Sequence, residues 1–152
     1  MALLTSVVTV SLSQDFDKGL ELAKNGYWAV ASLEFTPLAE QGHAEAQFML
    51  GGMYNDGLGV AQDHRTAVKW FSLAAEQGHP DAQNNLGTMY VRGTGVLQDH
   101  ARAHMWFNIA ASNGIEGAAR NRDTVSRKMT PADISKAQLM AQECVEKNYM
   151  GC

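Results

Sequence analysis

Residues 38–83 read LAEQGHAEAQFMLGGMYNDGLGVAQDHRTAVKWFSLAAEQGHPDAQ, and this stretch decides the fold because much of it returns further along the chain. Its EQGH opening at 40–43 recurs at 76–79, an offset of 36 residues. About half of the positions agree at that offset, far above chance, so the chain is predicted to stack similar units. The agreement covers small residues, aromatic residues and the turn, in the pairs Ala46/Ala82, Leu50/Leu86, Gly51/Gly87, Tyr54/Tyr90, Gly59/Gly95, Asp63/Asp99, Trp70/Trp106 and Phe71/Phe107.

Each copy has the pattern of two helices joined by a glycine-containing turn. Ala46, Leu50 and Met53 fall on one helical stripe, and Ala67, Trp70 and Phe71 begin a second one. Between them, residues 55–60 supply two glycines, which accept backbone angles that other residues avoid. The second helices are expected to begin at the N-caps Asp63 and Asp99, and the helix that follows 79 at Pro80.

One helical hairpin cannot bury its apolar stripe alone, so the copies must share it with their neighbours. The fold class is therefore all-α, an α-solenoid of antiparallel helix pairs in a right-handed superhelix with a C-terminal capping helix. In this arrangement Trp70 and Trp106 are expected to be buried in similar surroundings. The predicted helices run over about 15–25, 27–41, 43–55, 63–78, 79–91, 99–113, 114–127 and 131–147.

These motifs resemble the Sel1-like repeat, a relative of the tetratricopeptide repeat. The likeness lies in the segments 44–47, 50–54, 57–60, 67–71 and 74–78. It divides residues 14–128 into a degenerate copy at 15–42, clear copies at 43–78 and 79–114, and a partial copy at 115–128. Residues 129–152 form the capping helix and its cysteine-containing tail. In the degenerate copy Glu34 stands where tryptophan is expected. The resemblance implies an α-solenoid that acts as an adaptor for other proteins.

The two ends of the chain suggest an oxidising compartment. Residues 1–13 are apolar and hydroxyl-rich and change abruptly into charged sequence, which is typical of a signal-peptide remnant, although a loose tail is the alternative. The only cysteines, Cys144 and Cys152, lie eight residues apart and can close a short terminal loop or remain two unrelated thiols. A disulfide persists outside the cytoplasm, so we expect a periplasmic or secreted protein, with a cytoplasmic one as the alternative.

Charge and hydropathy argue against a nucleic-acid partner and against a membrane-spanning segment. The net charge is −4 and the basic face that duplex nucleic acid requires is missing, so no nucleic-acid partner is expected. No apolar run approaches the ~20 residues of a membrane span. The partner is expected to be a protein or peptide, and the chain is a possible subunit of an envelope assembly.

The residue types that carry chemistry occur here in structural positions. His43 and His79 are repeat equivalents, as are His64 and His100. Residues that recur in each repeat are expected to have a structural role and not to form one unique active site. His100 and His104 have metal-ligand spacing, but no third ligand lies nearby in the sequence, so no metal or cofactor is expected. No serine-nucleophile motif or P-loop occurs, so the chain is predicted not to be an enzyme. The alternative, implied by cysteine-rich relatives, is a secreted hydrolase acting on β-lactams or cell-wall peptides.

A candidate binding surface lies on the first helices, where residues differ between the two copies. In helical solenoids the first helices line the concave face, and positions that packing does not constrain are free to vary. Amide side chains there can hold a peptide backbone while Phe48 and Val91 add apolar contact. An unconstrained solvent-facing surface is the alternative. The predicted partner-binding residues are Phe48, Gly52, Asn55, Asn84, Asn85, Thr88, Val91 and Arg92.

Overall fold

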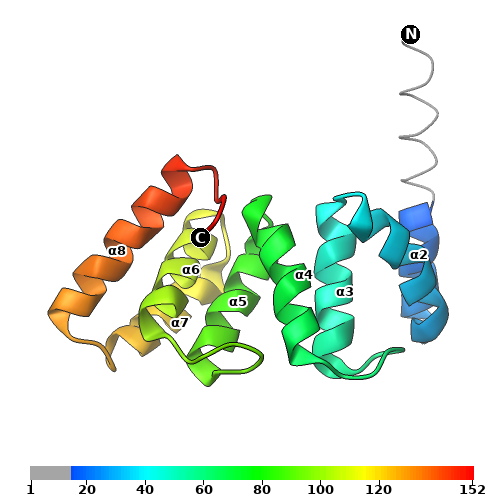
Figure 1. Ribbon diagram of the computed structural model, residues 1–152, viewed down its shortest axis with the longest axis horizontal. Helices are drawn as coiled ribbons and strands as arrows, with labels where there is room; N and C mark the ends of the chain where they lie inside the picture. The colour runs from blue at the N-terminus through cyan, green and yellow to red at the C-terminus, as the bar shows by residue number, and fades with distance from the viewer. Residues whose placement is uncertain (1–14) are drawn as a thin grey trace, which may run out of the picture.

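The computed structural model describes residues 15–152, and every regular element among them is a helix. Residues 15–24 are helical and are followed by seven further helices (Figure 1). The segment 1–13, predicted to be a signal remnant or tail, lies outside the described residues. The helices are α2 (Trp28–Glu40), α3 (Ala44–Asp56), α4 (His64–Glu76), α5 (Pro80–Arg92), α6 (His100–Ser112), α7 (Glu116–Ser126) and α8 (Pro131–Glu146).

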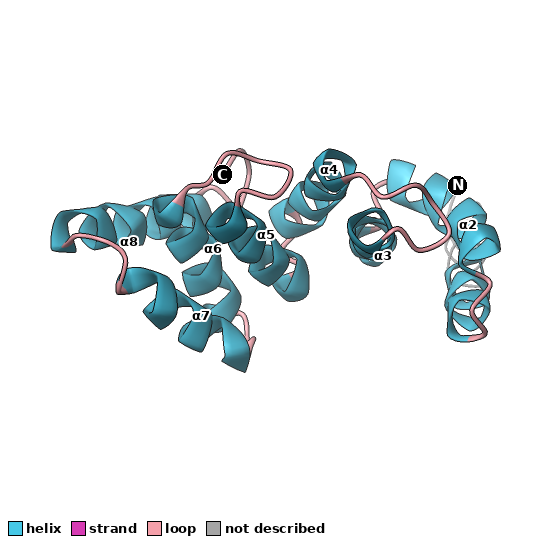
Figure 2. Ribbon diagram, turned by 90° about the horizontal axis from the view of Figure 1, so that it is seen from below, coloured by secondary structure: helices cyan, strands magenta, loops and turns pink. Residues whose placement is uncertain are grey.

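The predicted α-solenoid is confirmed, because consecutive helices from α2 to α7 pack against one another along the chain. The helices α3 and α4 form the first clear repeat, and α5 and α6 form the second. In Figure 2 the helices follow an arc, and α3 and α7 lie on its inner side. The helix bounds agree with the sequence prediction to within one or two residues.

Side chains outside the helices fix where each helix begins. Asp63 accepts from the backbone N–H groups of the first turn of α4, and Asp99 does the same for α6, as predicted. A hydrogen bond from the Thr66 hydroxyl further lowers the pKa of Asp63. His43 and His79 are also N-caps, since each accepts a backbone N–H at its Nδ1 atom. These histidines are thus structural.

Glycines let the two helices of each hairpin approach closely. A Cβ atom at Gly51 would lie 2.6 Å from the ring of Phe71, and one at Gly87 would lie 2.6 Å from the ring of Phe107. Gly19 meets Phe35 in the same way in the first, degenerate hairpin. The glycine–phenylalanine contact therefore occurs three times, once in each hairpin. It is kept in the degenerate hairpin, although Glu34 stands there in place of the expected tryptophan and pairs with Lys18.

The two equivalent tryptophans have different surroundings, which corrects the expectation from the repeat. Trp106 is 3% exposed, because α8 packs across the outer face of α6. Trp70 is only half-buried, and no described helix covers the same face of α4. The hydrophobic core that the repeats share is formed instead by Phe71, Ala74 and their equivalents Phe107 and Ala110, which are all buried.

The chain turns back after α8 and ends against the repeats (Figure 1). Cys144 and Cys152 form a disulfide, with their Cα atoms 5.6 Å apart. Asn148 and Tyr149 adopt left-handed backbone angles, with φ of 51° and 66°, and Gly151 does so as well. Left-handed angles cost non-glycine residues about 1–2 kcal/mol each. Contacts elsewhere must offset this cost.

Candidate functional site

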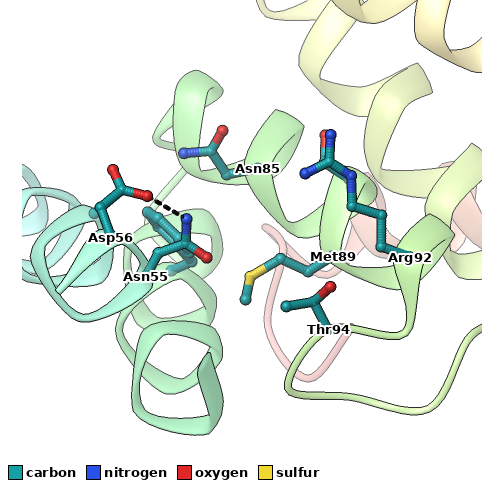
Figure 3. Close-up of a pocket in the computed structure, with 9 residues that line it drawn as sticks. Asn55, Asp56, Asn85, Met89, Arg92 and Thr94 are labelled. Carbon is teal, nitrogen blue, oxygen red and sulfur yellow. Dashed lines mark hydrogen bonds between the residues drawn. The ribbon is translucent and has the colours of Figure 1, made fainter. Parts of the chain in front are cut away.

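A hollow of about 280 Å³ lies between the first helices of the two clear repeats. Figure 3 shows Asn55 and Asp56 of α3 on one side, facing Asn85, Met89 and Arg92 of α5. Phe71 and Met89 form its apolar floor and are almost fully buried. The hollow is lined by Gly52, Asn55, Asp56, Phe71, Asn85, Thr88, Met89, Arg92 and Thr94.

A second hollow, of about 340 Å³, lies on the other side of α5, against α7. It shares Thr88 and Arg92 with the first hollow, so the two adjoin across α5. We call the two together the inner-face groove. The second hollow is lined by Thr88, Val91, Arg92, Phe107, Asn121, Thr124, Val125 and Lys128.

The polar side chains of the groove differ in whether their hydrogen bonds are already made. Asn55 donates to the carboxylate of Asp56 at 2.7 Å and its Oδ1 lies 3.2 Å from His64 Nδ1, which holds it in place. The side chains of Asn85 and Arg92 make no hydrogen bond or ion pair within residues 15–152. An amide that both donates and accepts suits a peptide backbone. Asn85 and Arg92 are thus available to a ligand.

Charge varies along the groove. Asp56 lies at the end formed by α3, Arg92 lies in the middle, and Lys128 follows α7 at the far end. No ion pair joins Asp56 to Arg92 among the described side chains. Two cations at α5 and α7 therefore favour a ligand whose acidic group lies over the second hollow.

The structure brings six of the eight predicted binding residues together. Five of them line the first hollow, and Val91 joins Thr88 and Arg92 in the second. Phe48 lies elsewhere, because its ring stacks on the cap His79 with centroids 4.5 Å apart. Asn84 is hydrogen-bonded to Asn121 of α7. Phe48 and Asn84 thus support the helices beside the groove.

Histidines at metal-ligand spacing do not converge with other ligands. Within residues 15–152, no cluster of three or more His, Cys, Asp or Glu side chains is placed to hold a metal ion. His104 is 2% exposed, and its Nδ1 atom has no hydrogen-bond partner in the described chain. Burial lowers the pKa of His104, and the nearby charge of Arg122 lowers it further, against a smaller opposing effect of Asp123. The buried imidazole is therefore held neutral.

Stacked helix pairs with an open face on their first helices define a repeat protein of the α-solenoid class. The sequence matches the Sel1 repeat family over residues 44–79 and 80–115, so the two clear repeats of this chain are Sel1 repeats. Proteins of this family are generally non-catalytic modules of protein–protein interaction. No helix within residues 15–152 is long and apolar enough to cross a membrane.

Two solved structures show the same fold. One is a protective antigen of uropathogenic Escherichia coli strains with an SLR fold, which is 29% identical and superposes with a TM-score of 0.85 over 91% of this chain. The other is a Sel1 repeat protein from Oxalobacter formigenes, 34% identical, with a TM-score of 0.65 over 68% of this chain. The chain spans 31% and 41% of their respective lengths. No relative among the curated proteins matches the sequence.

Proposed function

We propose that the protein is an adaptor that holds a peptide segment of another protein in the inner-face groove. The observation that carries this proposal is the continuity of the two hollows across α5, which share Thr88 and Arg92. A groove that crosses three helices fits an extended chain, and its apolar floor can take a side chain between Phe71 and Met89.

The hydrogen-bonding groups determine what the segment must supply. The amide of Asn85 pairs with a backbone peptide group, which presents one donor and one acceptor. Arg92 and Lys128 favour an acidic side chain over the second hollow. The proposed ligand is therefore an extended segment with an apolar residue over the first hollow and an acidic residue over the second.

The experiment is a crosslinking pull-down from native extract with Asn85→Ala/Arg92→Ala as the test variant. Both side chains line the groove and make no hydrogen bond or ion pair within residues 15–152, so the variant should stay folded. The matched control is Lys136→Ala/Gln138→Ala, at two exposed residues of α8. We expect the test variant to bind the captured partner at least about tenfold more weakly, as for central interface residues. Retention of every partner by the test variant would overturn the proposed groove.

We also propose that the protein acts in an oxidising compartment, periplasmic or extracellular, as a soluble adaptor or a subunit of an envelope assembly. The disulfide between Cys144 and Cys152 supports this proposal, since such bonds rarely persist in the cytoplasm. Thiol labelling of the protein in fractionated cells tests the compartment, and labelling of both cysteines without added reductant would contradict it. Size-exclusion of native extract distinguishes a permanent subunit from a transient adaptor.

A further inference from the structure

A second groove lies beside α4, and it shares no lining residue with the inner-face groove. It has a volume of about 510 Å³ and is lined by α4 together with the end of α2 and the start of α3. We call it the α4 groove. The residues that matter for its shape are Ala39, Gly42, Gln47, Trp70, Leu73 and Gln77.

The same groove exists one repeat later, where the chain fills it with its own C-terminus. The equivalent residues, 36 positions further on, surround the contact of α8 with α6. Ala141 and Cys144 of α8 are buried in the same core cluster as Trp106 and Ile109. Tyr149 follows α8, and its ring lies so close to Gly78 that a Cβ atom there would be 3.2 Å from the ring.

The polar contacts of the filled groove also recur in the open one. Beside α6, Asn113 donates to Gln83 at 2.9 Å, and the hydroxyl of Tyr149 joins this pair at 3.3 Å. Beside α4, Gln77 donates to Gln47 at 2.8 Å in the same way. The place that corresponds to the tyrosine ring is open, since a Cβ atom at Gly42 would meet nothing within 4 Å.

Because no helix equivalent to α8 covers the α4 groove, the apolar side chains there are more exposed than their equivalents beneath α8. Ile109 is 2% exposed beneath α8, whereas its equivalent Leu73 is 37% exposed, and Trp70 is half-buried where Trp106 is covered. An exposed leucine next to a tryptophan forms an apolar patch that a helix with small side chains can bury. The patch is continuous with Met150 of the C-terminal tail, which also lines the α4 groove and is 62% exposed.

One difference between the grooves specifies the charge of the occupant. Lys69 of the α4 groove replaces Met105, which lines a small hollow together with Glu143 of α8. An acidic residue at the position of Glu143 would therefore face a lysine. Glu40 corresponds to Glu76, which accepts the backbone N–H of Gly151 after the tyrosine. Glu40 therefore offers the same carboxylate acceptor to the end of a chain that enters the α4 groove.

We propose that the α4 groove binds a helix of another protein that imitates α8. Its features are a face of small residues, an acidic residue in its last turns and a tyrosine just after its end. The tyrosine hydroxyl joins Gln77 and Gln47, and the helix covers Trp70 and Leu73. This site is separate from the inner-face groove, so a partner can hold either surface without the other.

The test uses residues 131–152 of this chain as the probe, a fluorescent peptide with its disulfide closed. A staple between positions 135 and 139, both exposed on α8, keeps the peptide helical. Fluorescence anisotropy with the intact protein is expected to give saturable binding. Leu73→Glu in the protein is expected to weaken it at least about tenfold. Leu97→Glu, at a loop residue that is 90% exposed, is the matched control and is expected to change nothing.

Two changes in the peptide identify the contacts. Tyr149→Ala is expected to weaken binding at least about tenfold, because the ring and its hydroxyl are lost. Glu143→Lys is expected to weaken binding to the wild type and to recover with Lys69→Glu in the protein.

Four results of the binding measurements would each overturn the proposal. They are no saturable binding, binding that Leu73→Glu leaves intact, loss of binding with Leu97→Glu, or no recovery in the charge exchange. Sedimentation of the protein alone is the last check. Self-association that Leu73→Glu abolishes would assign the groove to a second copy and not to a partner helix. None of these results depends on the inner-face groove.

Discussion

At the scale of single residues, the contact between Gly51 and Phe71 shows why small residues recur in the repeat. The helix crossing leaves no room for a Cβ atom at position 51, whereas Gly52, one residue later in the same helix, has open space. The two neighbouring glycines therefore have opposite roles, since only Gly51 is required by packing. Gly52 leaves room in the floor of the inner-face groove.

This contrast predicts opposite effects of one substitution. Gly51→Ala should lower the free energy of unfolding by about 1–3 kcal/mol, because the added methyl overpacks against Phe71. Gly52→Ala is the matched control and should raise it by about 0.5–1 kcal/mol through helix propensity. Urea denaturation followed by circular dichroism measures both. Equal effects at the two positions would show that the helices do not cross as described.

His104 gives the protein a predictable response to pH. Because its pKa is lowered in the folded state, the unfolded chain takes up a proton that the folded chain resists. Stability should therefore fall as pH drops through the ordinary histidine value of about 6.5. His104→Val, which installs the residue of the equivalent position Val68, should reduce this fall between pH ~7 and ~5. An unchanged pH dependence in the variant, measured by thermal unfolding, would rule out this role.

At the scale of helices and turns, much of the structure could be predicted from the sequence. The caps Asp63 and Asp99 and the first-turn Pro80 mark helix starts by local chemistry, so bounds came out within one or two residues. The capping role of His43 was not predicted, because histidine is not a usual cap. Its repetition at position 79, four residues after the buried Ala75, is the signal that could have revealed it.

The different burial of Trp70 and Trp106 could not be predicted from the repeat. Periodicity makes Trp70 and Trp106 equivalent, but α8 follows only the second copy and covers only the second tryptophan. The helix α8 is held by packing on α6 and by contacts of Tyr149 with Gly78 and Asn113, which are distant in sequence. The same limit applies to the candidate site. Position 48 differs between the two repeats, which suggested a free surface, but the ring of Phe48 stacks on the N-cap His79 of the next helix pair.

The terminal disulfide should stabilise the element that carries Tyr149. Closing so short a loop contributes about 2–3 kcal/mol in the chain-entropy model. Reduction should lower the free energy of unfolding by that amount, as measured by urea denaturation with and without reductant. Cys152→Ser should match the reduced protein and be insensitive to reductant. If the wild type were equally stable when reduced, the bridge would have no role in holding the tail.

At the scale of the whole molecule, repetition creates two kinds of open surface. The first helices leave the inner-face groove, where Asn85 and Arg92 are uncommitted. The second helices leave the α4 groove, whose equivalent is filled by α8. The two surfaces share no lining residue, so the two proposed binding sites are independent of each other.

Site-specific photo-crosslinking in native extract tests the adaptor role most directly. A photoreactive amino acid at position 85 lies in the inner-face groove, and the same group at position 136 lies on the exposed face of α8. We predict that position 85 forms a covalent adduct with one partner and that position 136 does not form it. A partner that crosslinks equally from both positions, or from 136 alone, would contradict the assignment of the groove.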